Sequence, residues 1–212
     1  MPGVLCVADG YAQSRWGGSI ETIGGTIIGF TLYALLSSAF GTFAIVWQET
    51  DRGPRVCRIF LPEEQASVEN LVQTDFADSS RLSCPTITEL GERIQSFLEG
   101  EAVDFELGVI ALENCSEFQG RVLLAVHGIP RGWVSTYGNI ARSLQVPGGA
   151  RAVGRALSLN PFPIIIPCHR IIKSNGELGG FRGGLRMKKI LLELEGIEFS
   201  QTGNVFANRI HY

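Results

Sequence analysis

The residues of this chain best suited to chemistry are a cysteine, a histidine and an arginine in direct succession. Cys168, His169 and Arg170 close the segment NPFPIIIPCHR, residues 160–170. A cysteine attacks as the thiolate, and a neighbouring base or positive charge favours that form at neutral pH. The segment therefore predicts cysteine nucleophilic catalysis. A buried structural cysteine is the alternative, because neighbours in sequence point in different directions and adjacency alone makes no Cys–His hydrogen bond.

The apolar run before the cysteine bears on how it is positioned. Residues 164–166 are three isoleucines, and such β-branched residues predict a short buried strand. Pro167 ends that strand. Cys168 is therefore expected at the end of a strand.

Two short helices are predicted on the N-terminal side of this segment. Ser135 and Thr136 are candidate N-caps of the first helix. The Gly- and Pro-containing segment 145–149 breaks it, and a second helix is predicted over residues 150–159. Two short helices joined by such a turn form a helix-turn-helix pattern, which is typical of DNA-binding proteins.

The second predicted helix has two distinct faces. Ala150, Val153 and Leu157 recur at helical spacing and are expected to be buried, whereas Arg151 and Arg155 fall together on another face.

Small residues surround the first of these arginines. Ala150, Ala152 and Gly154 lie close to Arg151 and carry almost no side chain, so this helix could approach a narrow groove closely. A major-groove reader would need longer polar residues, and the pattern therefore favours the minor groove. Tight helix–helix packing is the alternative.

The charge of the chain is distributed unevenly. Residues 1–120 hold 6 lysines and arginines against 17 acidic residues, whereas residues 121–190 hold 11 against Glu177 alone. The net charge of -3 therefore combines an acidic front half with a basic back half, which suggests two domains. The basic half is where a polyanion would bind, although a solvated basic surface would have the same composition.

The acidic half predicts a small sheet and two helices. The stretch 22–48 has no charged residue, but its glycines, serines and threonines favour strands over a membrane helix. Strands are predicted over residues 31–36, 42–47 and 56–61. Apolar residues at helical spacing predict helices over 87–98 and 116–126. Residues 1–30 match no pattern.

Length and composition exclude several classes of protein. The chain has 212 residues, 45% hydrophobic and 18% charged, which suits one or two compact domains and not a disordered chain or a collagen. Five cysteines cannot all pair internally, and no Cys-x-x-Cys pair occurs. We therefore expect no metal, no cleavable signal and a reducing compartment: the cytoplasm, or the nucleus of a eukaryote.

Residues 129–196 closely resemble the catalytic domain of the O6-alkylguanine-DNA alkyltransferases, the methylated-DNA–protein-cysteine methyltransferases. The resemblance rests on the segments IPRGWVSTYGNIA, RAVGRALSLNP, IIIPCHRII, LGGFRGGL and LLELEG, which occur in this order. It is looser over residues 31–119. It implies an α+β fold, in which a small ribonuclease-H-like sheet with a helix precedes a mostly helical, winged helix-turn-helix-like catalytic domain.

This resemblance also implies how the chain is divided. We expect an unassigned segment over residues 1–30, an N-terminal α/β domain over 31–118, a DNA-binding and alkyl-acceptor domain over 119–205 and a C-terminal tail over 206–212.

The resemblance implies roles for five catalytic residues. Cys168 is similar to the alkyl acceptor, and His169 to the base that polarises the thiol through a bound water. Glu195 resembles the acid that orients His169, and Asn160 the residue that supports the site. Tyr137 resembles the phenol that donates to guanine N3 as the base departs.

It also implies which residues meet the DNA and the lesion. Arg151 resembles the finger that enters the base stack where the flipped base was. The expected DNA-binding set is Tyr137, Ala150, Arg151, Ala152, Gly154 and Arg155. The expected substrate pocket is Leu157, Pro163, Leu178, Phe181 and Arg182. Further candidates for phosphate contacts are Arg142, Arg155, Arg170, Lys173, Arg182, Arg186, Lys188 and Lys189.

The implied function is single-turnover removal of the alkyl group from O6-alkylguanine, and also O4-alkylthymine, by a monomer. Its partner is duplex DNA, with no cofactor, no obligate protein partner and no membrane. Phe181 stands where the family often has tyrosine, which bears on substrate preference.

Three alternatives stay open beside this function. A lesion sensor would use the same pocket without transfer, although a related branch that binds without repair has tryptophan in place of the cysteine. A cysteine hydrolase would use Cys168, His169 and Glu195 repeatedly. A membrane-tethered form would insert residues 22–47.

Overall fold

The computed structural model describes residues 22–23, 26–27, 30–63, 66–206 and 210–211. Most of the unassigned segment 1–30 therefore lies outside the described residues. Within it the structure shows only a short antiparallel pair, β1 (Thr22–Ile23) and β2 (Thr26–Ile27).

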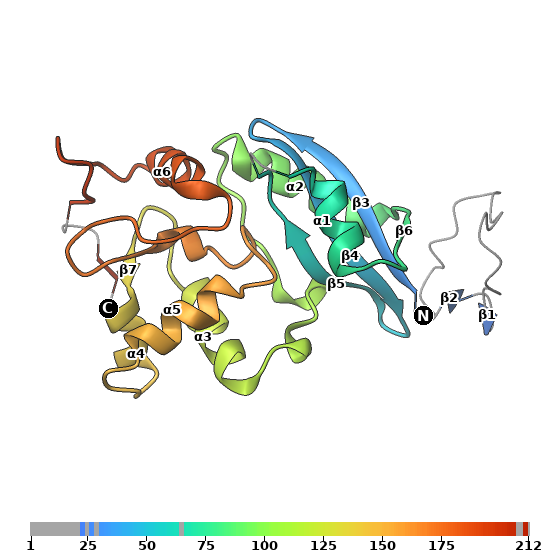
Figure 1. The fold of residues 1–212 in the computed structure, drawn as a ribbon, viewed down its shortest axis with the longest axis horizontal. Coiled ribbons are helices and arrows are strands. Elements are labelled where there is room, and N and C mark those ends of the chain that lie inside the picture. Colours follow the sequence, from blue (N-terminus) through green and yellow to red (C-terminus); the bar gives the residue numbers. More distant parts are fainter. Residues whose placement is uncertain (1–21, 24–25, 28–29, 64–65, 207–209, 212) are drawn as a thin grey trace.

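A four-stranded sheet forms the N-terminal half of the molecule (Figure 1). Its order is β5-β4-β3-β6, with β3 (Thr31–Ser38), β4 (Gly41–Thr50) and β5 (Gly53–Phe60) antiparallel and β6 (Ser80–Arg81) parallel to β3. The three predicted strands are confirmed. No helix among the described residues is long and apolar enough to cross a membrane.

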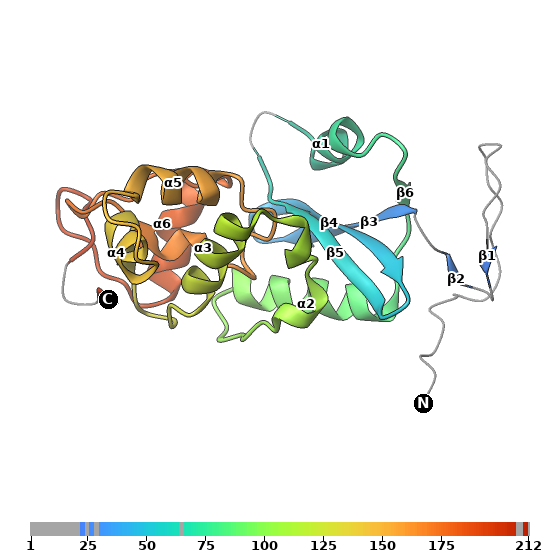
Figure 2. The same cartoon turned by 90° about the horizontal axis from the view of Figure 1, so that it is seen from below.

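Helices cover both faces of this sheet, α1 (Val68–Asp75) on one side and α2 (Pro85–Leu98) on the other (Figure 2). Ala44 and Val46 pack with α1, whereas Phe43 and Ile45 point into the core on the α2 side. Alternate residues of a strand face opposite sides, so a strand covered on both faces is apolar at every position. This explains the uncharged run in the sequence. The helix predicted over 87–98 is confirmed, and α1 was not predicted.

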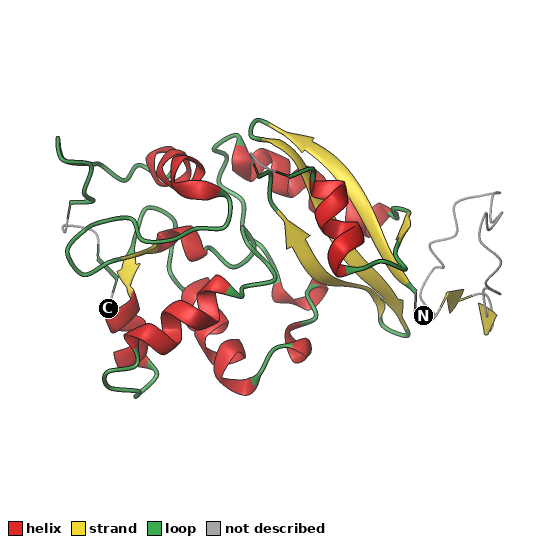
Figure 3. Cartoon of the chain, viewed as in Figure 1, coloured by secondary structure: helices red, strands yellow, loops and turns green. Residues whose placement is uncertain are grey.

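Four helices lie in the C-terminal half, joined by long loops (Figure 3). They are α3 (Glu117–His127), α4 (Tyr137–Ser143), α5 (Ala150–Ser158) and α6 (Gly184–Leu194), beside the short parallel pair β7 (Ser135–Thr136) and β8 (Ile171–Ile172). The 3-10 turns η1 (Leu107–Val109) and η2 (Leu112–Asn114) connect the halves. The α+β fold is therefore confirmed.

One hydrophobic core runs through both halves. It joins Phe97 and Leu98 of α2 with Val122 and Leu123 of α3, all buried. Ala111 in the connection donates its N–H to the Val56 carbonyl at 2.8 Å, next to the strand edge. The halves are therefore packed against each other as well as linked.

The strand predicted over residues 164–166 is wrong. These isoleucines are buried but form a turn, in which Ile164 has a φ of 76°. The side chain of Asn160 stabilises the turn, because it accepts from the Phe162 N–H at 2.9 Å and donates to the Ile166 carbonyl at 3.3 Å. Prolines at 161, 163 and 167 lack the N–H groups that a strand ladder needs. Cys168 therefore opens the 3-10 helix η3 (Cys168–Arg170) instead of ending a strand.

Candidate nucleophile and nucleic-acid interface

Cys168 is a half-buried residue at the start of η3. Its Sγ accepts a hydrogen bond from Asn160 Nδ2 at 3.4 Å, so the turn that replaces the predicted strand also holds the sulfur. Burial raises the pKa of the Cys168 thiol, while the Asn160 amide and the positive charge of Lys188 act in the opposite direction. The structure thus brings Asn160 and Cys168 together.

His169 directly follows Cys168 and is fully buried. Its Nε2 lies 3.0 Å from Glu195 Oε1. A carboxylate can only accept, so Nε2 carries the proton and Nδ1 presents the lone pair of a neutral ring. No described residue hydrogen-bonds to Nδ1. Burial lowers the pKa of His169, and Glu195 acts against that shift.

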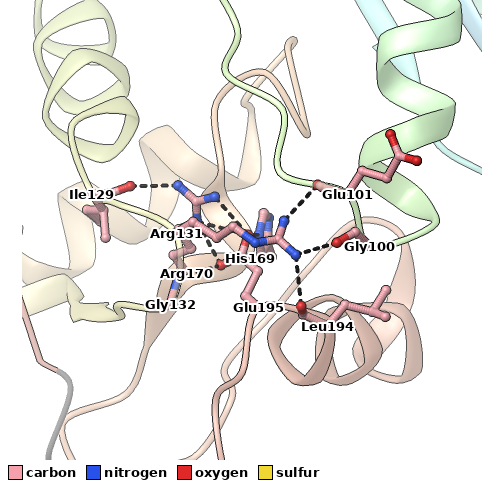
Figure 4. Close-up of polar contacts among 9 residues, drawn as sticks. All are labelled: Gly100, Glu101, Ile129, Arg131, Gly132, His169, Arg170, Leu194 and Glu195. Carbon is pink, nitrogen blue, oxygen red and sulfur yellow. Dashed lines mark hydrogen bonds and ion pairs between the residues drawn. The ribbon is translucent and has the colours of Figure 1, made fainter.

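Glu195 follows the last residue of α6 and connects several groups (Figure 4). Arg170 donates to its carboxylate from Nε at 2.9 Å and from Nη2 at 2.7 Å. Burial opposes the charge of Glu195, but the hydrogen bonds and charges of His169 and Arg170 hold its pKa at about 2. Glu195 is therefore an ionised partner that keeps the His169 ring in one orientation.

Arg170 is not available for the phosphate contact considered for it. It is buried, and Nη1 also donates to the Ile129 carbonyl at 2.6 Å. A buried arginine needs this many partners, because an uncompensated buried charge is costly. Nothing in the sequence around Arg170 indicated that its side chain would pair with Glu195 inside the protein.

Lys188 is likewise not a surface phosphate contact. It is fully buried in α6, where Nζ donates to the carbonyls of Ile171 at 2.5 Å and Gly180 at 3.3 Å. Burial lowers its pKa to about 8, and the nearby Cys168 acts against that shift. The spacing of residues could have indicated that Lys188 is buried, because Lys188 lies on the same face of α6 as the buried Leu191 and Leu192.

Tyr137 begins α4 close to the sulfur. A Cβ on Gly179 would lie 2.9 Å from its hydroxyl oxygen, and one on Gly154 3.7 Å from its ring. The phenol is therefore held between α5 and the loop before α6. Burial and the proximity of Cys168 raise the pKa of Tyr137, so the phenol stays protonated at neutral pH.

The predicted helix-turn-helix is present in α4 and α5, which pack on each other. Thr136 is the N-cap of α4 and accepts from the Asn139 N–H at 3.1 Å. Ser135 is not a cap; it is buried, and its hydroxyl donates to the His211 carbonyl.

The outer face of α5 has the expected character. Arg151, Ala152 and Arg155 are exposed, and Gly154 and Ala150 are half-buried. The expected stripe is buried at Val153 and Leu157, with Ala150 at its edge. A helix surface with two arginines among very small residues is thus open to solvent.

Only two of the five residues expected in a substrate pocket line the same cleft. Leu178 and Phe181 line a cleft of about 580 Å³ between the loop before α6 and residues 202–204. Pro163 and Leu157 are buried and Arg182 is exposed, and none of them lines this cleft. No group of three or more potential metal ligands occurs among the described residues.

The fold and the site define a class of protein: a helix-turn-helix joined to a half-buried cysteine with a His–Glu pair. Comparisons with known proteins agree. Residues 117–197 match the family model described as 6-O-methylguanine DNA methyltransferase, DNA binding domain. The chain belongs to the methylated-DNA–protein-cysteine methyltransferase family.

The relatives differ in how much of their length is matched. A methylated-DNA–protein-cysteine methyltransferase of Methanothermobacter thermautotrophicus is 48% identical over 111 residues, which are 52% of this chain and 62% of the relative. The chain therefore spans less than two thirds of that relative. A methylated-DNA–protein-cysteine methyltransferase of Sulfolobus acidocaldarius is 42% identical over 130 residues, which are 60% of this chain and 81% of the relative.

A solved structure is also similar. It is the Mycobacterium tuberculosis OGT in complex with DNA, with a TM-score of 0.62 and 29% identity. The match covers 77% of this chain and 92% of that chain.

Proposed function

We propose that this protein removes the alkyl group from O6-alkylguanine in duplex DNA, and from O4-alkylthymine, by transferring it irreversibly to Cys168. The observation that carries this proposal is that Cys168 accepts a hydrogen bond from the Asn160 amide and directly precedes His169, whose buried ring pairs with Glu195, in the same half as the exposed face of α5. The names of the similar proteins support it.

The acid–base groups suit a displacement by sulfur. Burial raises the pKa of the Cys168 thiol, so a base must take its proton, and His169 has an available lone pair on Nδ1. Glu195 stabilises the imidazolium that forms. The S–H proton thus goes to His169 through a bound water, and the sulfur attacks the alkyl carbon.

The departing base needs a proton donor. As the sulfur–carbon bond forms, the carbon–O6 bond breaks and its electrons pass to guanine. Tyr137 is protonated and lies near Cys168, so it can donate to guanine N3 and stabilise the developing charge. The proton that His169 took from the thiol then returns through water to the Tyr137–guanine pair. The products are S-alkylcysteine and an unmodified guanine, and the reaction needs no cofactor.

Access to the lesion requires base flipping. O6 lies on the Watson–Crick edge, which is enclosed in duplex DNA, and extrusion of the nucleotide costs a few kcal/mol. The small residues of α5 allow close approach to the minor groove, and the exposed Arg151 can fill the stack. The exposed Arg155 on the same helix can contact phosphate.

Each molecule acts once in this proposal. A thioether is not cleaved by thiols at neutral pH, so alkylated Cys168 is not regenerated by another cysteine. The stoichiometry separates a suicide transferase from the cysteine hydrolase, which would turn over.

The test is the mass of the intact protein after incubation with duplex DNA that holds one O6-methylguanine, followed by peptide mapping. We expect one methyl group, on Cys168, with saturation at one per protein and no transfer to Cys168→Ser. A folded protein that binds the lesion and gains no mass would instead be a lesion sensor.

A further inference from the structure

The guanidinium of Arg131 lies between the ends of two helices from different halves of the molecule (Figure 4). Nη2 donates to the Gly100 carbonyl at 2.6 Å, just beyond α2, and to the Leu194 carbonyl at 2.8 Å, the last residue of α6. Nη1 donates to the Glu101 carbonyl at 2.9 Å. One side chain therefore links three carbonyl groups across the boundary between the halves.

Electrostatics explains why a cation is needed there. The C-terminal end of a helix carries unpaired carbonyl groups and a partial negative charge. Neither α2 nor α6 has a basic residue in its own last turn. Two negative helix ends thus converge, and Arg131 supplies the compensating charge from outside both helices.

The two helix ends also touch directly. A Cβ on Gly100 would lie 2.9 Å from Leu194 Cδ2, and Gly100 has a φ of 101°, which favours glycine. The Arg131 guanidinium carbon lies 6.0 Å from the ring centroid of Phe97, one turn earlier in α2. The end of α2 is therefore held against α6 by packing as well as by hydrogen bonds.

This contact adjoins the acid of the site. Glu195 directly follows Leu194, and the N–H of Gly132, directly after Arg131, lies 3.5 Å from Glu195 Oε2. A shift at the end of α6 would move this carboxylate relative to His169 Nε2, which is 3.0 Å away.

We propose that Arg131 is a positioning residue, which clamps α2 to the end of α6 and so holds Glu195 and His169 in the geometry that activates Cys168. The inference rests on the proposed function. It makes the acidic N-terminal half part of the catalytic apparatus, although that half contributes no atom to the reaction. The Arg131 side chain donates its hydrogen bonds to backbone carbonyl groups, and in this role it does not bind DNA.

Arg131→Ala is the principal test, with Arg93→Ala as the matched control. Arg93 also donates to a carbonyl, that of Asp104, and lies 5.9 Å over a phenylalanine ring, that of Phe105, but it reaches no residue of α6. The measurement is the first-order rate of methyl transfer at saturating lesion DNA, with the dissociation constant of the DNA measured separately. We expect Arg131→Ala to lose about tenfold or more in rate at unchanged DNA affinity, because small displacements of catalytic groups have such effects. Arg93→Ala should keep the wild-type rate.

Two further readouts separate positioning from mere folding stability. Glu195 raises the pKa of His169, against burial and the charges of Arg170 and Lys188, so a displaced Glu195 should lower that pKa and move the rising limb of the pH–rate profile to lower pH. Guanidinium ion at low millimolar concentration should partly restore Arg131→Ala and not affect Arg93→Ala. Arg131→Lys keeps the positive charge but not the two-pronged guanidinium, and its rate of methyl transfer should lie between those of the wild type and Arg131→Ala. It replaces Arg131→Ala as the test variant if the alanine variant does not fold.

Either of two results would overturn the inference: a folded Arg131→Ala with the wild-type rate and pH profile, or one that loses only DNA affinity. The proposed function fails separately, if the wild type transfers no methyl group. In that case the His169 ring still reports the clamp, because its pKa, followed by NMR, should fall in Arg131→Ala and not in Arg93→Ala.

Discussion

Phe97 and His169 meet edge to face across the boundary between the two halves, with ring centroids 5.7 Å apart and an interplanar angle of 61°. Phe97 is in the last turn of α2, whereas His169 follows Cys168 in η3. Phe181 packs on the same imidazole at 6.3 Å. The ring next to the reactive sulfur is thus enclosed by one residue from each half.

Phe97→Leu should weaken both the fold and the reaction. The buried ring of Phe97 is lost, which should lower the free energy of unfolding by about 1–2 kcal/mol. The rate of methyl transfer should fall because His169 gains freedom to turn. Urea denaturation and single-turnover kinetics measure the two effects. Phe76→Leu is the control, since Phe76 packs on Phe60 beside α1; an equal loss of rate there would contradict the assignment.

Glu195 should govern acid stability. Its pKa is about 2 in the folded protein, below its ordinary value of 4.5, so the stabilisation is complete above pH 4.5 and is lost as the pH falls towards 2. Glu195→Gln leaves Arg170 buried without a counter-charge and should cost about 3–5 kcal/mol at neutral pH. Urea midpoints measured against pH check this. A difference between variant and wild type that did not shrink below pH 4.5 would contradict it.

Lys188→Met should separate stability from reactivity. The pKa of Lys188 is about 8, below its ordinary value of 10.5, so the folded state binds its proton less tightly than the unfolded state. The stability of the wild type should therefore rise between pH 8 and pH 10.5, and this rise should vanish in Lys188→Met. The variant should also react more slowly, since Lys188 lowers the pKa of Cys168. Alkylation of Cys168 by iodoacetamide against pH should show a midpoint displaced upwards.

Gly179→Ala should displace the phenol of Tyr137. The new Cβ would lie 2.9 Å from the hydroxyl oxygen, and the φ of 69° at this position strains any other residue. We expect about tenfold slower methyl transfer in single-turnover kinetics. Gly180→Ala is the matched control, because nothing lies within 4 Å of its Cβ position. Equal rates for the two variants would place Tyr137 outside the reaction.

Arg151→Ala should impair repair only where a base must be flipped. With duplex DNA the rate should fall at least about tenfold, since the cost of extrusion is no longer offset. With free O6-benzylguanine as the alkyl donor the rate should match the wild type, because no base leaves a stack. Arg52→Ala, at an exposed turn of the sheet, is the control. A loss with the free base as well would assign Arg151 to the pocket.

Much of the fold could be predicted because its signals are local. Strand β3 and most of β4 lie in the uncharged stretch 22–48, and β5 follows the turn at residues 51–52. Helix α2 follows from apolar residues at helical spacing. Helix α1 was missed, since eight residues with only Val68 and Val72 buried carry little periodicity. The turn at 164–166 was predicted as a strand, because the Asn160 side chain and the prolines outweigh the preference of isoleucine.

The sequence by itself predicted Cys168 as the nucleophile and His169 as its base, and it determined the helix-turn-helix, because each depends on residues close together in the chain. Only the tertiary structure decided which charges are buried. Arg170 and Lys188 were expected at the surface, and both lie inside, one on Glu195 and the other on backbone carbonyls. The role of a charged side chain depends on the dielectric and the partners around it, and distant segments supply both.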